Sequence, residues 1–137
     1  MARTLEVQVE QVGRATGKGI ARNHTVFIDR PADKGGEDRG PLGGELLLLS
    51  LGGCFLSNLL AAIGARSAEV SNIRIAVSAT VGGVPERVEA MTLRVAATYT
   101  DSELMRKLVG IAERGCLVTN TLKTAMVITI VLENSSQ

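Results

Sequence analysis

The first residues of the chain alternate apolar and polar side chains with the two-residue period of a half-buried β-strand. This pattern predicts a strand over residues 4–9, with Leu5, Val7 and Val9 on one face. A second strand is predicted over residues 24–29, after a connection that contains Gly13, Gly17 and Gly19. Residues 31–44 are rich in glycine and charge, which predicts a loop, and loops of this length in compact domains are commonly functional.

The segment from Glu45 to Arg66 is apolar at nearly every position, rich in Leu and Ala, and free of proline. We expect one long helix that ends near Arg66 and, being hydrophobic all round, lies buried at the centre of the fold. A membrane span is the competing interpretation, since a span needs about 20 apolar residues. Five residues dilute the hydrophobicity and favour the buried helix: Ser50, Gly52, Gly53, Ser57 and Asn58.

Two more alternating segments, residues 73–81 and 91–99, flank the turn sequence Gly82-Gly83-Val84-Pro85. They are expected to pair as an antiparallel hairpin with one buried face. The following run Thr100-Asp101-Ser102-Glu103 has the form of a capping box, which predicts the start of a helix.

The pattern in the last part of the chain predicts the end of this helix, a second short helix and a closing strand. Gly115 is a good end for the helix that the capping box begins. A short helix is expected over residues 116–122, and a closing strand over residues 125–132. The expected order is β-β-α-β-β-α-β, an α+β fold with antiparallel strands and a long central helix, and residues 1–137 form a single domain.

Composition narrows the possible partners. The chain has 137 residues and is 45% hydrophobic but only 2% aromatic, so its core is built from aliphatic side chains. The net charge is +1 without a dense basic cluster, and stacking platforms for bases need aromatic residues, so no nucleic-acid partner is expected. The N-terminus has no apolar stretch typical of a signal peptide, which predicts a cytoplasmic protein.

In a reducing compartment, the two cysteines, Cys54 and Cys116, are more typical of free thiols, metal ligands or a redox pair than of a permanent disulfide. Metal binding is not favoured, because His24 is the only histidine and no CxxC motif is present. Serine-type hydrolysis is not favoured either, because His24 is the only candidate base and lies in a predicted strand without a nucleophile signature. Cys54 follows two glycines in the predicted central helix, and Cys116 begins a helical turn where N–H donors favour a thiolate. Taken singly, each cysteine is more typical of core packing than of chemistry.

The segments around the two cysteines carry a more specific pattern. The run Gly43–Cys54 reads G-G-E-L-L-L-L-S-L-G-G-C, and the run Ala112–Leu122 reads A-E-R-G-C-L-V-T-N-T-L. The first resembles P-x-E-L-L-L-A-A-L-G-x-C and the second A-x-x-x-C-x-V-x-x-x-L. These are the two cysteine segments of the OsmC/Ohr family, named for osmotically inducible protein C and organic hydroperoxide resistance protein. Element order and cysteine separation also fit, so the resemblance covers essentially the whole chain.

The resemblance implies a thiol peroxidase for oxidative or osmotic stress defence, built as an intertwined homodimer. Cys54 would be the peroxidatic residue, whose thiolate attacks a hydroperoxide and becomes a sulfenic acid. Cys116 would be the resolving residue, which condenses with that sulfenic acid to a disulfide. No bound cofactor is implied; the reductant would be an external dithiol, which is of the lipoyl type in the family's organic-hydroperoxide branch. Neither a membrane nor a nucleic acid is expected as a partner.

The resemblance also implies an arginine that serves the thiolate. Arg30, after the predicted second strand, best matches its position in the OsmC branch, whereas Arg14 better matches the Ohr branch. Arg22 and Arg39 stay open as alternatives.

In the family, a carboxylate near the start of the central helix orients this arginine. Glu45 is the candidate here, nine positions before Cys54 where the family's glutamate lies ten before. Gly44 holds that place, and Gly43 replaces the signature proline, which predicts a divergent OsmC-like branch. Glu45 could instead serve as a helix N-terminal charge favoured by the dipole.

Two other functions stay open. One is a non-enzymatic redox sensor or a protein that binds a small apolar ligand in the same fold. The other is an oligomerisation module in which the cysteines only pack.

Overall fold

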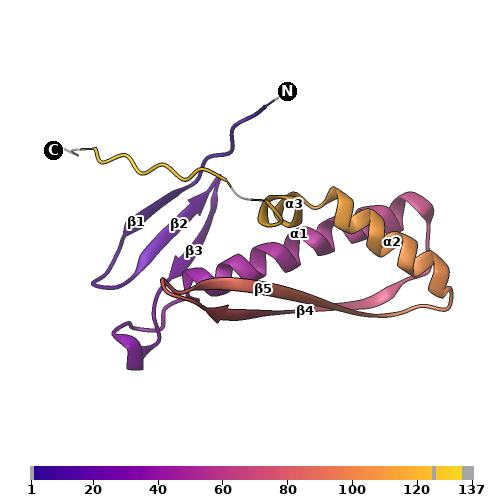
Figure 1. The fold of residues 1–137 in the computed structure, drawn as a ribbon, viewed down its shortest axis with the longest axis horizontal. Coiled ribbons are helices and arrows are strands. Elements are labelled where there is room, and N and C mark those ends of the chain that lie inside the picture. Colours follow the sequence, from indigo (N-terminus) through magenta and orange to yellow (C-terminus); the bar gives the residue numbers. More distant parts are fainter. Residues whose placement is uncertain (1, 125, 134–137) are drawn as a thin grey trace. The chain divides into compact units, whose positions relative to one another are not determined.

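The computed structural model describes residues 2–124 and 126–133 (Figure 1). The chain divides into two compact units, residues 1–50 and 51–137, and each is described by itself.

The first unit contains a three-stranded antiparallel sheet of β1 (Gln8–Gln11), β2 (Gly17–Ala21) and β3 (His24–Ile28), in the order β1-β2-β3. The two strands predicted here are present as β1 and β3, although β1 covers residues 8–11 rather than 4–9. Strand β2 was missed, because its two glycines disfavour a strand in sequence terms. The sheet itself explains these glycines: added Cβ atoms would lie 3.1 Å from Val9 Cγ1 at Gly17 and 3.1 Å from Val26 Cγ1 at Gly19.

The expected loop after β3 contains one turn of 3-10 helix, η1 (Ala32–Lys34), and folds around the buried carboxylate of Asp29. This carboxylate accepts hydrogen bonds from the Thr16 hydroxyl at 2.8 Å and from the backbone N–H of Arg30 at 2.7 Å. Burial raises the pKa of Asp29, but these bonds, with others from backbone N–H groups, hold the pKa below its usual value. The Asp29 side chain is therefore a carboxylate anion, and its hydrogen bonds hold the start of the loop in place.

The second half of the chain confirms the predicted hairpin. Strands β4 (Ser71–Gly82) and β5 (Arg87–Thr98) pair antiparallel, with Ile75 opposite Val95 and Ala79 opposite Met91. Helix α2 (Ser102–Gly115) follows, and the Asp101 carboxylate caps it by accepting a hydrogen bond from Leu104 N–H at 3.0 Å. The helix ends at Gly115, as expected.

Helix α1 (Gly43–Arg66) confirms the predicted long helix, but it is not buried on all sides. Its buried residues form one stripe that packs in the core of the second unit: Leu51, Phe55, Leu59 and Ala62. Leu60, off this stripe, is 52% exposed. The expectation of all-round burial is therefore wrong for the single chain, because the hairpin and α2 supply covering side chains for only part of the helix surface.

By length and composition alone, α1 could cross a membrane. The core helix of a water-soluble protein passes the same test, so this observation on one helix is weak evidence for a span.

After α2 the chain forms α3 (Leu117–Leu122), which confirms the predicted short helix. The predicted closing strand over 125–132 is not formed by residues 126–132, and Ala125 lies outside the described residues. These residues have strand-forming side chains but pair with none of the described strands, and Val127 and Ile130 are each 91% exposed. The described elements are therefore ordered β-β-β-α-β-β-α-α, and the α+β class with antiparallel strands and a long central helix is confirmed.

Candidate redox site

Helix α1 holds Cys54 in a half-buried position in the second unit. The glycine pair before it serves the packing of the hairpin at one position only. A Cβ at Gly52 would come 3.1 Å from Val77 Cγ2 of β4, whereas a Cβ at Gly53 would meet nothing within 4 Å. Gly52 therefore allows β4 to approach the helix closely just before Cys54.

Cys116 lies at the junction of α2 and α3, as the C-cap of the first helix and the N-cap of the second. Its side chain is fully buried. The sulfur accepts a hydrogen bond from the backbone N–H of Thr119, with N and Sγ 3.5 Å apart. The sequence signal for this contact is the three-residue spacing, because an N-cap side chain typically accepts a hydrogen bond from the N–H three residues later.

The structure brings the two cysteines together. Both are free thiols, and the Cys54 thiol is one of the groups beside the Cys116 sulfur that lower the pKa of Cys116. Cys54 also packs against the apolar cluster that contains Cys116. A half-buried thiol thus lies beside a fully buried one in the same apolar cluster.

The surroundings of Cys116 favour its thiolate. Burial raises the pKa of the Cys116 thiol, because a charged sulfur is poorly solvated there. Hydrogen bonds from the side chain and backbone of Thr119, from the Cys54 thiol and from the backbone of Val118 outweigh that effect. The pKa of Cys116 is therefore lowered from its ordinary value, as a thiol that attacks another sulfur requires.

Asn58 lies one helical turn after Cys54 and is the polar neighbour that sequence reasoning missed. Its Nδ2 donates to the backbone oxygen of Cys54 at 2.9 Å and lies 3.8 Å from Cys54 Sγ. Its Oδ1 lies 3.1 Å from the position that a Cβ at Gly115 would take. The spacing of four residues on a helix was the available signal.

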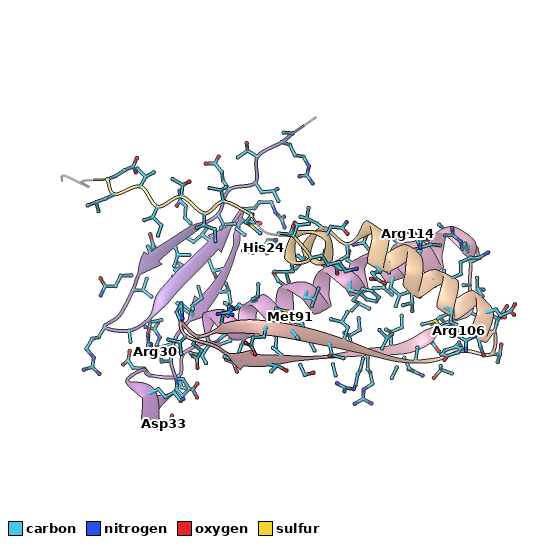
Figure 2. The ribbon with its side chains drawn as sticks, viewed as in Figure 1. His24, Arg30, Asp33, Met91, Arg106 and Arg114 are labelled. Carbon is cyan, nitrogen blue, oxygen red and sulfur yellow. The ribbon has the colours of Figure 1, made fainter. Side chains whose placement is uncertain are left out.

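An apolar hollow of about 290 Å³ adjoins this region within the second unit. Figure 2 labels one of its residues, Met91 on β5. The hollow is lined from α1, β5, α2 and α3: Leu51, Phe55, Met91, Leu93, Val95, Val109, Glu113 and Thr119. Thr119 also bonds Cys116, so this residue links the hollow to the thiol pair.

The charged candidates, Arg30 and Glu45, belong to the first unit, and their placement near the thiols stays a prediction. Arg30 follows β3 and has an exposed side chain (Figure 2). Glu45 Oε1 accepts a hydrogen bond from Leu42 N–H at 2.8 Å. Glu45 therefore caps the N-terminus of α1, in keeping with the helix N-terminal role left open from the sequence.

The alternative arginines have different surroundings within the first unit. Arg14 and Arg22 are exposed, and Arg22 adopts a left-handed backbone, φ 56°, in the tight turn between β2 and β3. The Arg39 guanidinium lies over the Phe27 ring, 4.9 Å from its centroid, and is thereby held in a cation–π contact.

Among residues 2–124 and 126–133, no group of three or more His, Cys, Asp or Glu side chains has a geometry that could hold a metal ion.

Comparison with known proteins gives one family match. The family model described as OsmC-like protein matches residues 35–131 of the chain. Among curated proteins, none matches the sequence significantly.

Solved structures share the fold. The OsmC-like protein of Mycoplasma pneumoniae superposes with a TM-score of 0.78 at 15% identity, over 90% of this chain and 89% of that one. The organic hydroperoxide resistance protein OsmC of Legionella pneumophila gives 0.67 at 16% identity, over 90% and 91%. The organic hydroperoxide resistance protein OhrB of Bacillus subtilis gives 0.64 at 20% identity, over 88% and 91%.

Proposed function

Since a family model covers residues 35–131, this chain belongs to the OsmC-like protein family, and we propose that it is a Cys-dependent thiol peroxidase that reduces organic hydroperoxides. The resemblance to OsmC and Ohr proteins is confirmed by this match and by the shared fold. Two structural neighbours are named for resistance to organic hydroperoxides, which supports the reaction class.

The observation that carries the proposal is the placement of two free thiols in one apolar cluster. Cys54 is half-buried and Cys116 fully buried, so Cys54 is the sulfur that a peroxide reaches first. Its thiolate attacks the outer peroxide oxygen, the O–O bond breaks, and the alkoxide leaves and takes up a proton as an alcohol. Cys54 is thereby oxidised to a sulfenic acid, and the hydroperoxide is reduced by two electrons.

Cys116 then closes the disulfide. Its thiolate attacks the sulfenic sulfur of Cys54, an S–S bond forms, and the S–OH group leaves as water after taking up a proton. The lowered pKa of Cys116 supports this role, because the attacking form is the thiolate. An external dithiol returns both cysteines to thiols and becomes a disulfide, and we propose a dithiol of the lipoyl type.

The apolar hollow supports an organic peroxide rather than hydrogen peroxide as the preferred substrate. Most of its lining residues are aliphatic or aromatic, and burial of an alkyl chain against them is favourable by about 0.8 kcal/mol per CH₂ group. Hydrogen peroxide has no such group and gains nothing from this surface.

We assign Arg30 the role of stabilising the Cys54 thiolate, with Glu45 orienting it. The Arg30 side chain is exposed, whereas the Arg39 guanidinium lies over the Phe27 ring. Glu45 keeps one carboxylate oxygen outside its bond to Leu42 N–H, which leaves an acceptor for an arginine.

The working form is proposed to be a homodimer in the cytoplasm. Apolar residues of one face of the N-terminal sheet are exposed in the single chain, with Val9 65% and Val26 41% accessible. Leu60 on α1 is 52% accessible, and the unpaired residues 126–132 are strand-forming. Exposed apolar surfaces of this kind are typically covered by a second copy, which supports the dimer. The two free thiols suit a reducing compartment, which supports the cytoplasm.

A steady-state assay tests the proposal. Consumption of cumene hydroperoxide with dihydrolipoamide as reductant is expected for the native protein and is abolished in Cys54→Ser. Arg30→Ala is expected to lower kcat/KM by at least tenfold, with Arg14→Ala, Arg22→Ala and Arg39→Ala as matched arginine controls. If no peroxide is consumed with any dithiol while a disulfide still forms, the redox-sensor alternative replaces the enzyme.

A further inference from the structure

The Asn58 carboxamide lies between the two segments that carry the thiols. One end contacts Cys54, through Nδ2 at 2.9 Å from the Cys54 oxygen and 3.8 Å from Cys54 Sγ. The other end faces the last residue of α2, since Oδ1 lies 3.1 Å from where a Cβ of Gly115 would be. The side chain thus spans from the first cysteine to the residue just before the second.

Gly115 makes this arrangement possible. A Cβ 3.1 Å from an oxygen is closer than ordinary van der Waals contact, so any larger residue would push the Asn58 carboxamide away. Gly115 directly precedes Cys116, which packs in the same apolar cluster as residues of α1.

We propose that Asn58 is a positioning residue of the thiol pair: it aims the Cys54 sulfur at Cys116 and donates an N–H to the Cys54 thiolate. A neutral amide suits this task, since it offers a donor without adding charge. A carboxylate in the same place would repel the thiolate, and an apolar residue would leave it without this donor. The catalytic meaning of the inference rests on the proposed peroxidase function.

The test reads the thiol directly and needs no peroxide. In a Cys116→Ser background, the rate of Cys54 alkylation by iodoacetamide is measured from pH 5 to pH 9 for Asn58, Asn58→Ala and Asn58→Asp. We expect Asn58→Ala to slow alkylation at neutral pH by about 3- to 10-fold and to displace the pH profile upward, as loss of a hydrogen bond to a charged group does. Asn58→Asp is expected to slow it further, and Ser57→Ala, its neighbour on α1, to leave it unchanged.

A second variant covers the other end of the carboxamide. Gly115→Ala in the chain with both cysteines is expected to slow disulfide formation by diamide several-fold. Gly110→Ala is the matched control in the same helix, because its Cβ meets only the flexible end of Arg114 at 3.3 Å.

An unchanged alkylation rate and an unchanged pH profile in folded Asn58→Ala would overturn the inference. Asn58 would then only donate a hydrogen bond to the helix backbone. If Asn58→Ala does not fold, equal diamide rates for Gly115→Ala and Gly110→Ala overturn it instead. A protein that fails to consume peroxide yet shows the expected alkylation shift keeps the positioning role and loses only the proposed reaction.

Discussion

Thr119 supplies two of the hydrogen bonds that lower the pKa of Cys116, one from its side chain and one from its backbone. Thr119→Val keeps the shape and the backbone N–H but removes the hydroxyl. The pKa of Cys116 should then rise, and disulfide closure at neutral pH should slow by about 3- to 10-fold.

Rapid-quench mass spectrometry after a pulse of hydroperoxide measures that closure. Thr121→Val is the control on the same helix, since the Thr121 hydroxyl bonds only Leu117 O, at 2.8 Å. Equal closure rates for the two variants would contradict the role of the Thr119 hydroxyl.

The lowered pKa of Cys116 also predicts how stability depends on pH. The unfolded thiol titrates near pH 8.5, above the folded pKa, so between these values the unfolded state binds more protons. The stabilising contribution is therefore present above the unfolded pKa and is lost as pH falls through the folded pKa.

Urea unfolding under reducing conditions, compared between the native chain and Cys116→Ser, checks this sign. The difference in unfolding free energy between the two proteins should grow from neutral pH toward about pH 9, because the thiol titrates in this range. A difference that shrinks with rising pH would mean that burial, not hydrogen bonding, dominates at this sulfur.

At the scale of elements, the loop after β3 depends on backbone contacts that leave no room for side chains. A Cβ at Gly40 would meet the backbone oxygen of Phe27, and a Cβ at Gly36 the backbone oxygen of Arg30. Gly40→Ala is expected to destabilise the protein by about 2–4 kcal/mol, because backbone cannot yield as a flexible side chain does.

Gly43→Ala is the matched control, since its Cβ would meet nothing within 4 Å at the start of α1. Thermal unfolding should show a clear loss for Gly40→Ala and no loss for Gly43→Ala. Equal melting temperatures would mean that the loop rearranges around the added methyl group.

The elements also show how far the sequence can predict this fold. The hairpin, α2 and its Asp101 cap followed from local patterns, because strand period and capping chemistry are local properties. Strand β2 was missed, since Gly17 and Gly19 are explained only by the valines on neighbouring strands. The contact of Asn58 with Gly115 was missed for the same reason, because the two residues are distant in sequence.

The two cysteines themselves became a pair in sequence terms only through the family pattern, since spacing alone does not bring residues 54 and 116 together. The structure adds their packing in one apolar cluster and the difference in burial. The partners of Arg30 and Glu45 depend on long-range placement, which no local pattern encodes.

As a whole molecule, the protein is expected to self-associate through the exposed apolar face of the N-terminal sheet. Sedimentation velocity should show a dimer for the native chain. Val9→Asp is expected to shift the equilibrium toward monomer, because it places a charge in the covered surface.

Val84→Asp is the control, an exposed valine in the turn between β4 and β5, 98% accessible. It should leave the dimer intact. A native monomer at micromolar concentration would contradict the proposed assembly.

The proposed reaction is checked by treating the reduced protein with one equivalent of cumene hydroperoxide, followed by intact-mass and peptide-mapping mass spectrometry. We expect the loss of two hydrogens per chain and one linked peptide pair joining Cys54 to Cys116. Cys116→Ser should instead stop at a Cys54 sulfenic acid that dimedone traps, and Cys54→Ser should leave Cys116 unmodified. Two unmodified thiols in the native chain after this treatment would contradict the claim that the pair reduces hydroperoxides.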